Sequence, residues 1–291
     1  MYPSRFAYEA PKTLGEAIAL LDASGGEAKI LAGGQSLIPM VKLRFASPEM
    51  LVDINNIPGL DYIRMDPDGT LRIGALARHE DFEHSATLAE THPTLAAAAS
   101  LVADPIVRTR GTFVGSLCHA DPQGDWSATM VALGGRIVAQ GPNGKREIDV
   151  RSFVLGPFSN ALAFNEIAVE AVIPPVKGRP AGSYLKLERR VGDFATASVA
   201  VALDMNGATV GHAGCALAGV GGRTIDANDA ISVLVGKTLN AESIEAAADA
   251  VATAADPRTD HRGSADYKRH IVKTFVTRIL NNIANSEQKA A

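Results

Sequence analysis

The stretch AKILAGGQSLIPMVKLRFASPEMLVDI, residues 28–54, decides the fold of the first part of the chain. Its opening AKILA is a short apolar run typical of a buried strand, and MLVDI at 50–54 is a second one. Between them the turn Gly33–Ser36 leads into LIPMVKLRF, which predicts a helix because Pro39 falls in its first turn. The pattern indicates a strand, a glycine turn, a short helix and a strand, which together form a compact α/β unit.

The rest of the chain predicts an α+β protein without a fixed-period repeat. Thr13 and Glu16 form a capping-box pattern at the start of an apolar helical repeat. Pro174–Pro175 and the following GRPAG indicate a linker. The other expected elements are hairpins around DPDG 66–69 and GPNG 141–144, a helix at about 94–102, strands at 167–173, 194–205 and 214–220, and helices at about 227–236, 241–255 and 264–280.

Composition excludes several classes of partner. The 291 residues are 46% hydrophobic and 21% charged, and a net charge of -4 gives no basic surface for nucleic acid or an anionic membrane. No apolar run is long enough to span a bilayer, and the N-terminus lacks the pattern of a secretory signal. Two distant cysteines, Cys118 and Cys215, form no CxxC pair and no disulfide framework. We therefore expect a cytoplasmic protein without a membrane span.

The glycine turn at 33–36 has two possible explanations. A turn without side chains exposes backbone N–H groups, which can hold phosphate oxygens, and Gln35 and Ser36 would add side-chain donors. The sequence has neither the GxGxxG pattern nor the lysine of a Walker loop. A tight turn that needs positive φ explains the glycines equally well.

A second glycine-containing stretch, RGTFVGSLCHADPQGD at 110–125, strengthens the phosphate hypothesis. Thr112, Gly115 and Ser116 again combine small residues with hydroxyl groups after an apolar stretch. Two such turns could hold the two phosphates of a pyrophosphate from both sides. Asp125 precedes an apolar helical run, where it could cap a helix or bind a ligand hydroxyl group.

Four stretches together resemble the FAD-binding medium subunit of the molybdenum hydroxylases, the family of carbon monoxide, xanthine and N-heterocycle dehydrogenases. They are AGGQSLIPMVKLR, ADPIVR-x-RGT-x-x-G, HADPQGD and LERRVGDFATAS, and the resemblance extends from about Phe6 to about Phe275. It implies an FAD-binding domain at 1–177 of the vanillyl-alcohol oxidase type, with subdomains at about 1–56 and 57–177. It also implies a C-terminal α+β domain at 178–291 with a three-stranded antiparallel sheet and helices.

The resemblance also implies which residues bind FAD. Lys186, which could otherwise be a solvated strand charge, matches a lysine near the flavin ring, where a cation stabilises reduced flavin. Phe194 falls where relatives often have a tyrosine. Val114 departs from the TIGGN pattern of the second loop, and it would be strained at positive φ. The implied FAD-binding residues are Ala32, Gly33, Gly34, Gln35 and Ser36 in a first pyrophosphate loop, Thr112, Gly115 and Ser116 in a second, Asp125, Ile167, Ala168 and Lys186.

Other reactive side chains are better explained by structure, and we assign no catalytic residue and no metal ligand. His79, His84 and His119 lack the spacing of a metal site, so solvated or structural histidines are favoured. Cys118 is expected to be a small buried residue in a tight loop, and Trp126 to pack at a helix start.

The cysteine count places the remaining redox centres on other chains. A [2Fe–2S] cluster needs four ligands, and this chain has only two cysteines. The resemblance implies a dimer of heterotrimers, in which electrons pass from a molybdenum-pterin large subunit through a [2Fe–2S] small subunit to FAD on this chain. An external acceptor, which could be NAD, a quinone, a cytochrome or oxygen, then takes them. The alternatives are a free-standing flavin oxidase and a nucleotide-binding structural subunit.

Overall fold

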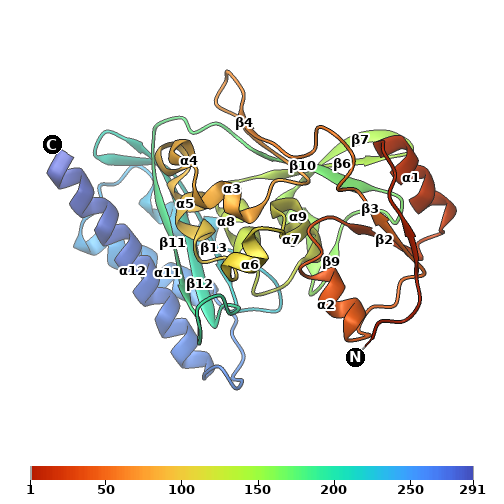
Figure 1. Ribbon diagram of the computed structural model, residues 1–291. Coiled ribbons are helices and arrows are strands. Elements are labelled where there is room, and N and C mark those ends of the chain that lie inside the picture. Colours follow the sequence, from red (N-terminus) through yellow and green to blue (C-terminus); the bar gives the residue numbers. More distant parts are fainter. Residues whose placement is uncertain (1, 291) are drawn as a thin grey trace.

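The computed structural model describes the backbone of residues 2–290 and the side chains of residues 2–286. Figure 1 shows a small N-terminal α/β unit at one end of the molecule and two long C-terminal helices at the other. The N-terminal unit has the parallel strand order β1-β3-β2, with β1 at Ala7–Glu9, β2 at Ala28–Leu31 and β3 at Met50–Asp53. Helices α1 (Leu14–Ala23) and α2 (Leu37–Lys42) complete it, and the predicted capping box of Thr13 and Glu16 is present.

The middle of the chain is built on an antiparallel sheet with the order β4-β5-β10-β6-β7. Both predicted hairpins are confirmed, because β4 pairs with β5 and β6 with β7. The strands are Ile63–Met65 (β4), Leu71–Gly74 (β5), Arg136–Gly141 (β6), Gly144–Asp149 (β7) and Ile167–Ile173 (β10), with a small hairpin at Val154–Gly156 (β8) and Ser159–Asn160 (β9).

Seven short helices accompany this sheet. The helix expected at about 94–102 is α5, which begins at Pro93 and ends at Ala99, before a loop in which Ala103 has a φ of 52°. These helices are His79–Glu83 (α3), Ala86–Thr91 (α4), Pro93–Ala99 (α5), Pro105–Arg108 (α6), Phe113–His119 (α7), Asp125–Ala132 (α8) and Val150–Phe153 (α9).

The C-terminal part is an antiparallel sheet of three long strands, extended at one edge by a two-residue fourth strand that the sequence did not predict. Its order is β11-β12-β13-β14. The strands are Arg179–Leu187 (β11), Ala197–Asn206 (β12), Thr209–Ala218 (β13) and Ile225–Asp226 (β14). The helices are Asn228–Ile231 (α10), the 3-10 turn Ser232–Leu234, Ala241–Ala254 (α11) and Ala265–Ala290 (α12).

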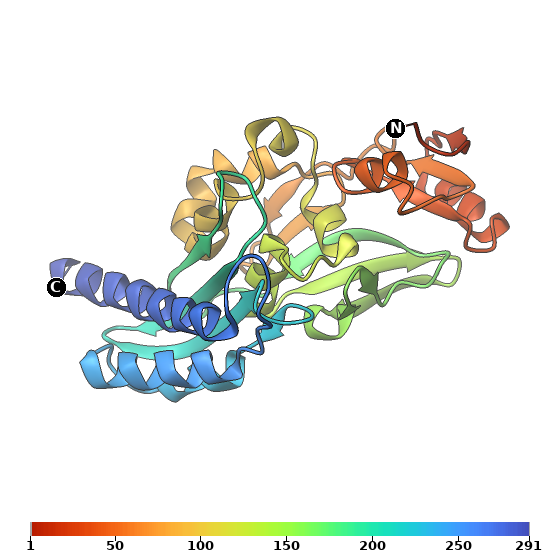
Figure 2. The same ribbon diagram turned by 90° about the horizontal axis from the view of Figure 1, so that it is seen from below.

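The C-terminal sheet has helices on both faces. Val199, Val201 and Leu203 of β12 belong to the core under α11 and α12, which lie side by side in Figure 2. The alternate residues Ala200 and Ala202 belong to the core of the first part, as the two-residue period of a strand requires. Small residues permit close packing there, since a Cβ on Gly214 would lie 1.8 Å from the Ala132 carbonyl oxygen of α8. The C-terminal sheet therefore joins the two parts of the molecule.

No helix in residues 2–290 is both long enough and apolar enough to cross a lipid bilayer.

Candidate functional site

The first glycine loop, Ala32–Ser36, connects β2 to α2. Gly34 has a φ of 75°, so the tight-turn explanation holds for that position. The backbone N–H groups of Gly33, Gly34, Gln35 and Ser36 donate no hydrogen bond within the described residues. The loop is partly buried, so these N–H groups can meet water or a ligand rather than another part of the chain. The loop therefore combines a tight turn that requires glycine with a set of available donors.

The second glycine stretch is not a turn but the start of helix α7. Thr112 is the N-cap residue, and its Oγ1 accepts a hydrogen bond from Gly115 N at 3.2 Å. Ser116 N donates to Thr112 O at 3.0 Å, so two of the predicted donors are used inside the helix. Val114 is buried in this helix and is absent from the positive-φ residues, which removes the strain that its side chain would cause in a turn.

The two glycine segments are in direct contact. A Cβ built on Gly33 would lie 2.3 Å from Arg110 O, 2.8 Å from Gly111 Cα and 3.0 Å from Thr112 N. Only a glycine permits this approach of the two backbones, since real Cβ atoms do not come so close. The fold thus brings together the loop at 32–36 and the start of α7, which are about 75 residues apart in sequence.

The short segment Ala77–His79 holds the start of α7, a role that no pattern in the sequence indicated. His79 N donates to Gly111 O at 3.0 Å, and Phe113 N donates to Ala77 O at 3.1 Å. His79 Nδ1 accepts from Trp126 Nε1 at 2.9 Å, and burial lowers the pKa of His79 to about 4. His79 is therefore a neutral structural histidine, as predicted, and Trp126 does more than fill space.

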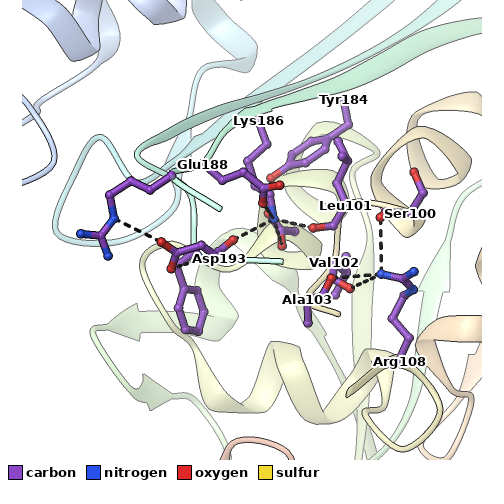
Figure 3. Close-up of polar contacts among 12 residues, drawn as sticks. Ser100, Leu101, Val102, Ala103, Arg108, Tyr184, Lys186, Glu188 and Asp193 are labelled. Carbon is purple, nitrogen blue, oxygen red and sulfur yellow. Dashed lines mark hydrogen bonds and ion pairs between the residues drawn. The ribbon is translucent and has the colours of Figure 1, made fainter. Parts of the chain in front are cut away.

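Asp125 and Lys186 form a buried cluster where the first part meets the C-terminal sheet. Figure 3 shows Lys186 with Tyr184 and Glu188 of this cluster. Asp125 is the first residue of α8 and does not cap it, since the N-cap is Gly124. Its Oδ1 accepts from the Tyr184 hydroxyl at 2.5 Å, and its Oδ2 lies 3.3 Å from Lys186 Nζ. The Lys186 side chain is 0% exposed, so the explanation as a solvated strand charge is wrong.

Lys186 Nζ has oxygen atoms on several sides. It donates to the Leu101 carbonyl oxygen and, at 3.1 Å, to Asp193 O, and it lies 3.2 Å from Glu188 Oε2. One ammonium group therefore faces the carboxylates of Glu188 and Asp125. Burial is the main cause that raises the pKa of Asp125, and the Glu188 charge adds to it against the attraction of Lys186.

The loop that supplies the Leu101 oxygen is held from its other side by Arg108 (Figure 3). The Arg108 guanidinium donates to the carbonyl oxygens of Val102 at 3.3 Å and Ala103 at 3.0 Å, and to Glu83 Oε2 at 2.8 Å. Lys186 and Arg108, one from each part of the molecule, thus donate hydrogen bonds to successive carbonyl oxygens of a single loop. This arrangement fixes the backbone beside Lys186.

The remaining predicted residues are Ile167, Ala168, Phe194 and Cys118, of which Phe194 directly follows Asp193 of the Lys186 cluster. Ile167 and Ala168 are buried at the start of β10, beside a bulge between Ala168 and Glu170. Phe194 is 47% exposed in the loop between β11 and β12. Cys118 lies in α7 and is partly exposed, so its placement in a tight loop was wrong.

The other two histidines make no common site. His84 is exposed, and His119 Nε2 lies 4.0 Å from Asp121 Oδ2. Within the part of the chain that the structure describes, no group of three or more His, Cys, Asp or Glu side chains could hold a metal ion.

Two family models match the chain. Residues 4–176 match the FAD binding domain in molybdopterin dehydrogenase, and residues 182–283 match the CO dehydrogenase flavoprotein C-terminal domain. The carbon monoxide dehydrogenase medium chain of Hydrogenophaga pseudoflava is 43% identical over 97% of this chain and 98% of its own. The 6-hydroxypseudooxynicotine dehydrogenase complex subunit alpha of Paenarthrobacter nicotinovorans is 36% identical over 96% of this chain and 95% of its own.

Solved structures agree over nearly the whole length. A chain of the Hydrogenophaga pseudoflava carbon monoxide dehydrogenase superposes with a TM-score of 0.92 at 44% identity, covering 99% of both chains. A chain of quinoline 2-oxidoreductase from Pseudomonas putida 86 superposes with a TM-score of 0.90 at 32% identity, also covering 99% of both.

Proposed function

Because this chain belongs to the family of FAD-binding medium subunits of molybdenum hydroxylases, we propose that it binds the FAD pyrophosphate between the loop at 32–36 and the start of α7. The free N–H groups of Gly33–Ser36, together with the contact between Gly33 and Arg110–Thr112, carry this proposal. Unpaired backbone donors at a glycine turn suit phosphate oxygens, and the missing Cβ of Gly33 lets the two segments approach each other. The residues present therefore fit the cofactor that the family binds.

The second part of the proposal concerns Asp125 and Lys186. FAD, when bound, supplies reversible redox chemistry, and a nearby cation stabilises the negative charge of its reduced form. The Lys186 ammonium group already faces oxygens of Leu101, Asp193 and Asp125, so its charge rather than a new hydrogen bond would act on the flavin. Asp125 would accept a hydrogen bond from a cofactor hydroxyl group, and the backbone of Ile167 and Ala168 would lie close to the ring.

We further propose that the chain works as the electron exit of a heteromeric dehydrogenase. Two relatives are named as a medium chain and as a subunit of a dehydrogenase complex, respectively. By analogy, a molybdenum-containing large subunit and a [2Fe–2S] small subunit would deliver electrons here, in a dimer of heterotrimers. An external acceptor would then take them. We place the boundary between the FAD-binding and C-terminal domains at about residue 177, in the Pro174–Pro175 linker region.

The experiment is to purify the chain together with its partner subunits and to record its visible absorption spectrum. We expect flavin bands that bleach with dithionite, and one FAD released per chain on denaturation. A colourless complex that takes up no FAD would favour a structural subunit. Rapid bleaching of the isolated, FAD-loaded chain by an aldehyde or heterocycle would favour a free-standing oxidase.

A further inference from the structure

Two side chains outside the glycine segments connect them through hydrogen bonds. Asn55 Nδ2 donates to Ala32 O in the first loop at 2.8 Å. Arg78 Nη2 donates to Asn55 Oδ1 at 2.6 Å, and Arg78 Nη1 donates to Arg110 O at 2.5 Å. One continuous series of hydrogen bonds therefore runs from the first loop to the segment before α7, with the Asn55–Arg78 pair at its centre.

The pair is itself held in place by neighbouring carboxylates. Asp53 Oδ1, at the end of β3, accepts from Asn55 N at 2.9 Å and from Asn55 Nδ2 at 2.6 Å. Asp81 Oδ2 accepts from Arg78 N at 2.8 Å. Both Asn55 and Arg78 are partly buried, where water replaces a lost hydrogen bond less easily than at an exposed surface. The pair is therefore a fixed bridge rather than a mobile surface contact.

The bridge decides which backbone atoms of the two segments are left without a hydrogen-bond partner. It occupies the carbonyl oxygens of Ala32 and Arg110, and His79 N occupies that of Gly111. A carbonyl oxygen directed at a phosphate would repel it, whereas an N–H group would bind it. By bonding these oxygens, the bridge leaves the N–H groups of Gly33–Ser36 as the groups that can meet an anion.

The bridge also sets the distance between the loops. The two phosphates of a pyrophosphate share one bridging oxygen, so two donor sets can bind them together only at a narrow range of separations. The Gly33 backbone touches Arg110–Thr112 at the same place where Arg78 bonds Arg110 O. Contact without a tether could open, and a tether that ends on both loops prevents this.

We propose that Asn55 and Arg78 are a positioning pair, which sets the spacing of the two pyrophosphate loops without touching the cofactor. The inference rests on the proposed function, because it requires FAD to lie between these loops. It predicts that the pair acts as a unit: once either side chain is removed, the tether is lost, and removing the other changes little more.

The test is a double-mutant cycle on the full chain purified with its partner subunits. The variants are Asn55→Ala, Arg78→Ala and the double variant, and the measurement is FAD affinity, followed by the fluorescence of released FAD. We expect each single variant to weaken binding about tenfold and the double variant to match the singles. The melting temperature of the FAD-free protein, measured in parallel, should fall only slightly, because the pair acts on FAD binding more than on the stability of the fold.

Two conservative variants keep the test informative if an alanine variant does not fold. Asn55→Asp retains the acceptor for Arg78 but loses the donor to Ala32 O, so it should weaken FAD binding like the alanine variant. Arg78→Lys offers one compact ammonium group, which cannot span Asn55 Oδ1 and Arg110 O as the planar guanidinium does, so binding should also weaken.

The control is Arg151→Ala, because among the described residues the Arg151 side chain donates hydrogen bonds to Asp149 alone. It should leave FAD affinity at the wild-type value. Wild-type affinity in the Asn55 and Arg78 variants, or effects that multiply in the double variant, would overturn the inference. A wild-type complex that holds no FAD would instead overturn the proposed function, so the two failures are distinguishable.

Discussion

Gly33 and Gly34 are neighbours in the first loop, yet a side chain would meet different obstacles at the two positions. A Cβ at Gly33 would collide with the Arg110 carbonyl oxygen at 2.3 Å, whereas a Cβ at Gly34 would meet only side chains at 3.2 Å but at a φ of 75°. Gly33→Ala should therefore separate the loops and reduce FAD affinity strongly. Gly34→Ala should mainly reduce stability, by about 1–2 kcal/mol.

FAD titration and thermal unfolding of both variants check this prediction. Gly222→Ala is the matched control, because a Cβ there meets no atom within 4 Å and the backbone has no positive φ. Equal FAD affinity in the Gly33 and Gly34 variants would contradict the assignment of the close contact to Gly33.

His92 gives a second prediction at the residue scale, on pH. The side chain is buried, and burial lowers its pKa from 6.5 to about 4. Between these pH values the unfolded chain binds a proton at His92 that the folded chain does not bind. The free energy of unfolding is therefore highest above about pH 6.5 and falls as the pH is lowered toward 4. The loss at pH 5 is about 2 kcal/mol for this one histidine.

Urea unfolding of His92→Gln at pH 7.5 and pH 5 measures that loss. The free energy of unfolding of the variant should depend less on pH than that of the wild type. If the variant loses as much unfolding free energy between pH 7.5 and pH 5 as the wild type, His92 is not a source of the acid sensitivity.

The sequence could reveal some site residues and not others, for physical reasons. Gly33 and Gly34 stand out because few positions require the absence of a side chain. Arg78 and Asn55 carry no such signal, because the hydrogen bonds that join them to the two segments go to backbone carbonyls that any sequence would supply. The burial of Lys186 was equally hidden, since its partners come from segments about 60 and 85 residues earlier in the chain.

Helix α7 changes the expected effect of a substitution in the second glycine stretch, because this stretch is helical and not a turn. Val114 lies inside it, is 1% exposed and belongs to the core of the first part. Val114→Gly should therefore destabilise the protein by about 3 kcal/mol, of which about 1 comes from glycine in a helix and the rest from lost packing. FAD affinity should change little, because the valine side chain points into the core.

Chemical denaturation and FAD titration of this variant test the helix assignment. Ala98→Gly in α5 serves as a comparison for a buried helical position with a smaller side chain, and it should cost less. A Val114→Gly protein more stable than the wild type would mean that valine is strained there.

Elements with a strong local signal were predictable from the sequence. The hairpins at DPDG and GPNG and the strand β10 appear where alternation and turn residues placed them. The second glycine stretch was mistaken for a turn because a single hydroxyl group, Thr112 Oγ1, caps the helix. The sequence does not show that this hydroxyl group accepts from Gly115 N. The edge strand β14 has two residues, which is too short for a periodic pattern.

At the scale of the whole molecule, the buried cluster joins two parts that the chain visits far apart. Lys186 comes from β11 of the C-terminal sheet, while Asp125 and Leu101 come from the first part. The glycine and alanine face of that sheet lets α5 and α8 approach closely enough for these contacts. The charge arrangement of the candidate site therefore depends on the packing between the two parts.

The last prediction concerns this junction. Lys186→Met removes the cation and leaves the carboxylates of Asp125 and Glu188 facing each other in a buried site. Breaking a buried ion pair from one side costs about 3–5 kcal/mol, because the remaining charge has no partner. The unfolding free energy of the FAD-free protein should fall by that amount, and the added change Glu188→Gln should restore part of it by removing one charge.

Lys29→Met, at an exposed position of β2, is the control and should be neutral. If Lys186→Met unfolds at the wild-type denaturant concentration, the cluster does not hold the two parts together, and only the proposed effect of the Lys186 charge on FAD would remain.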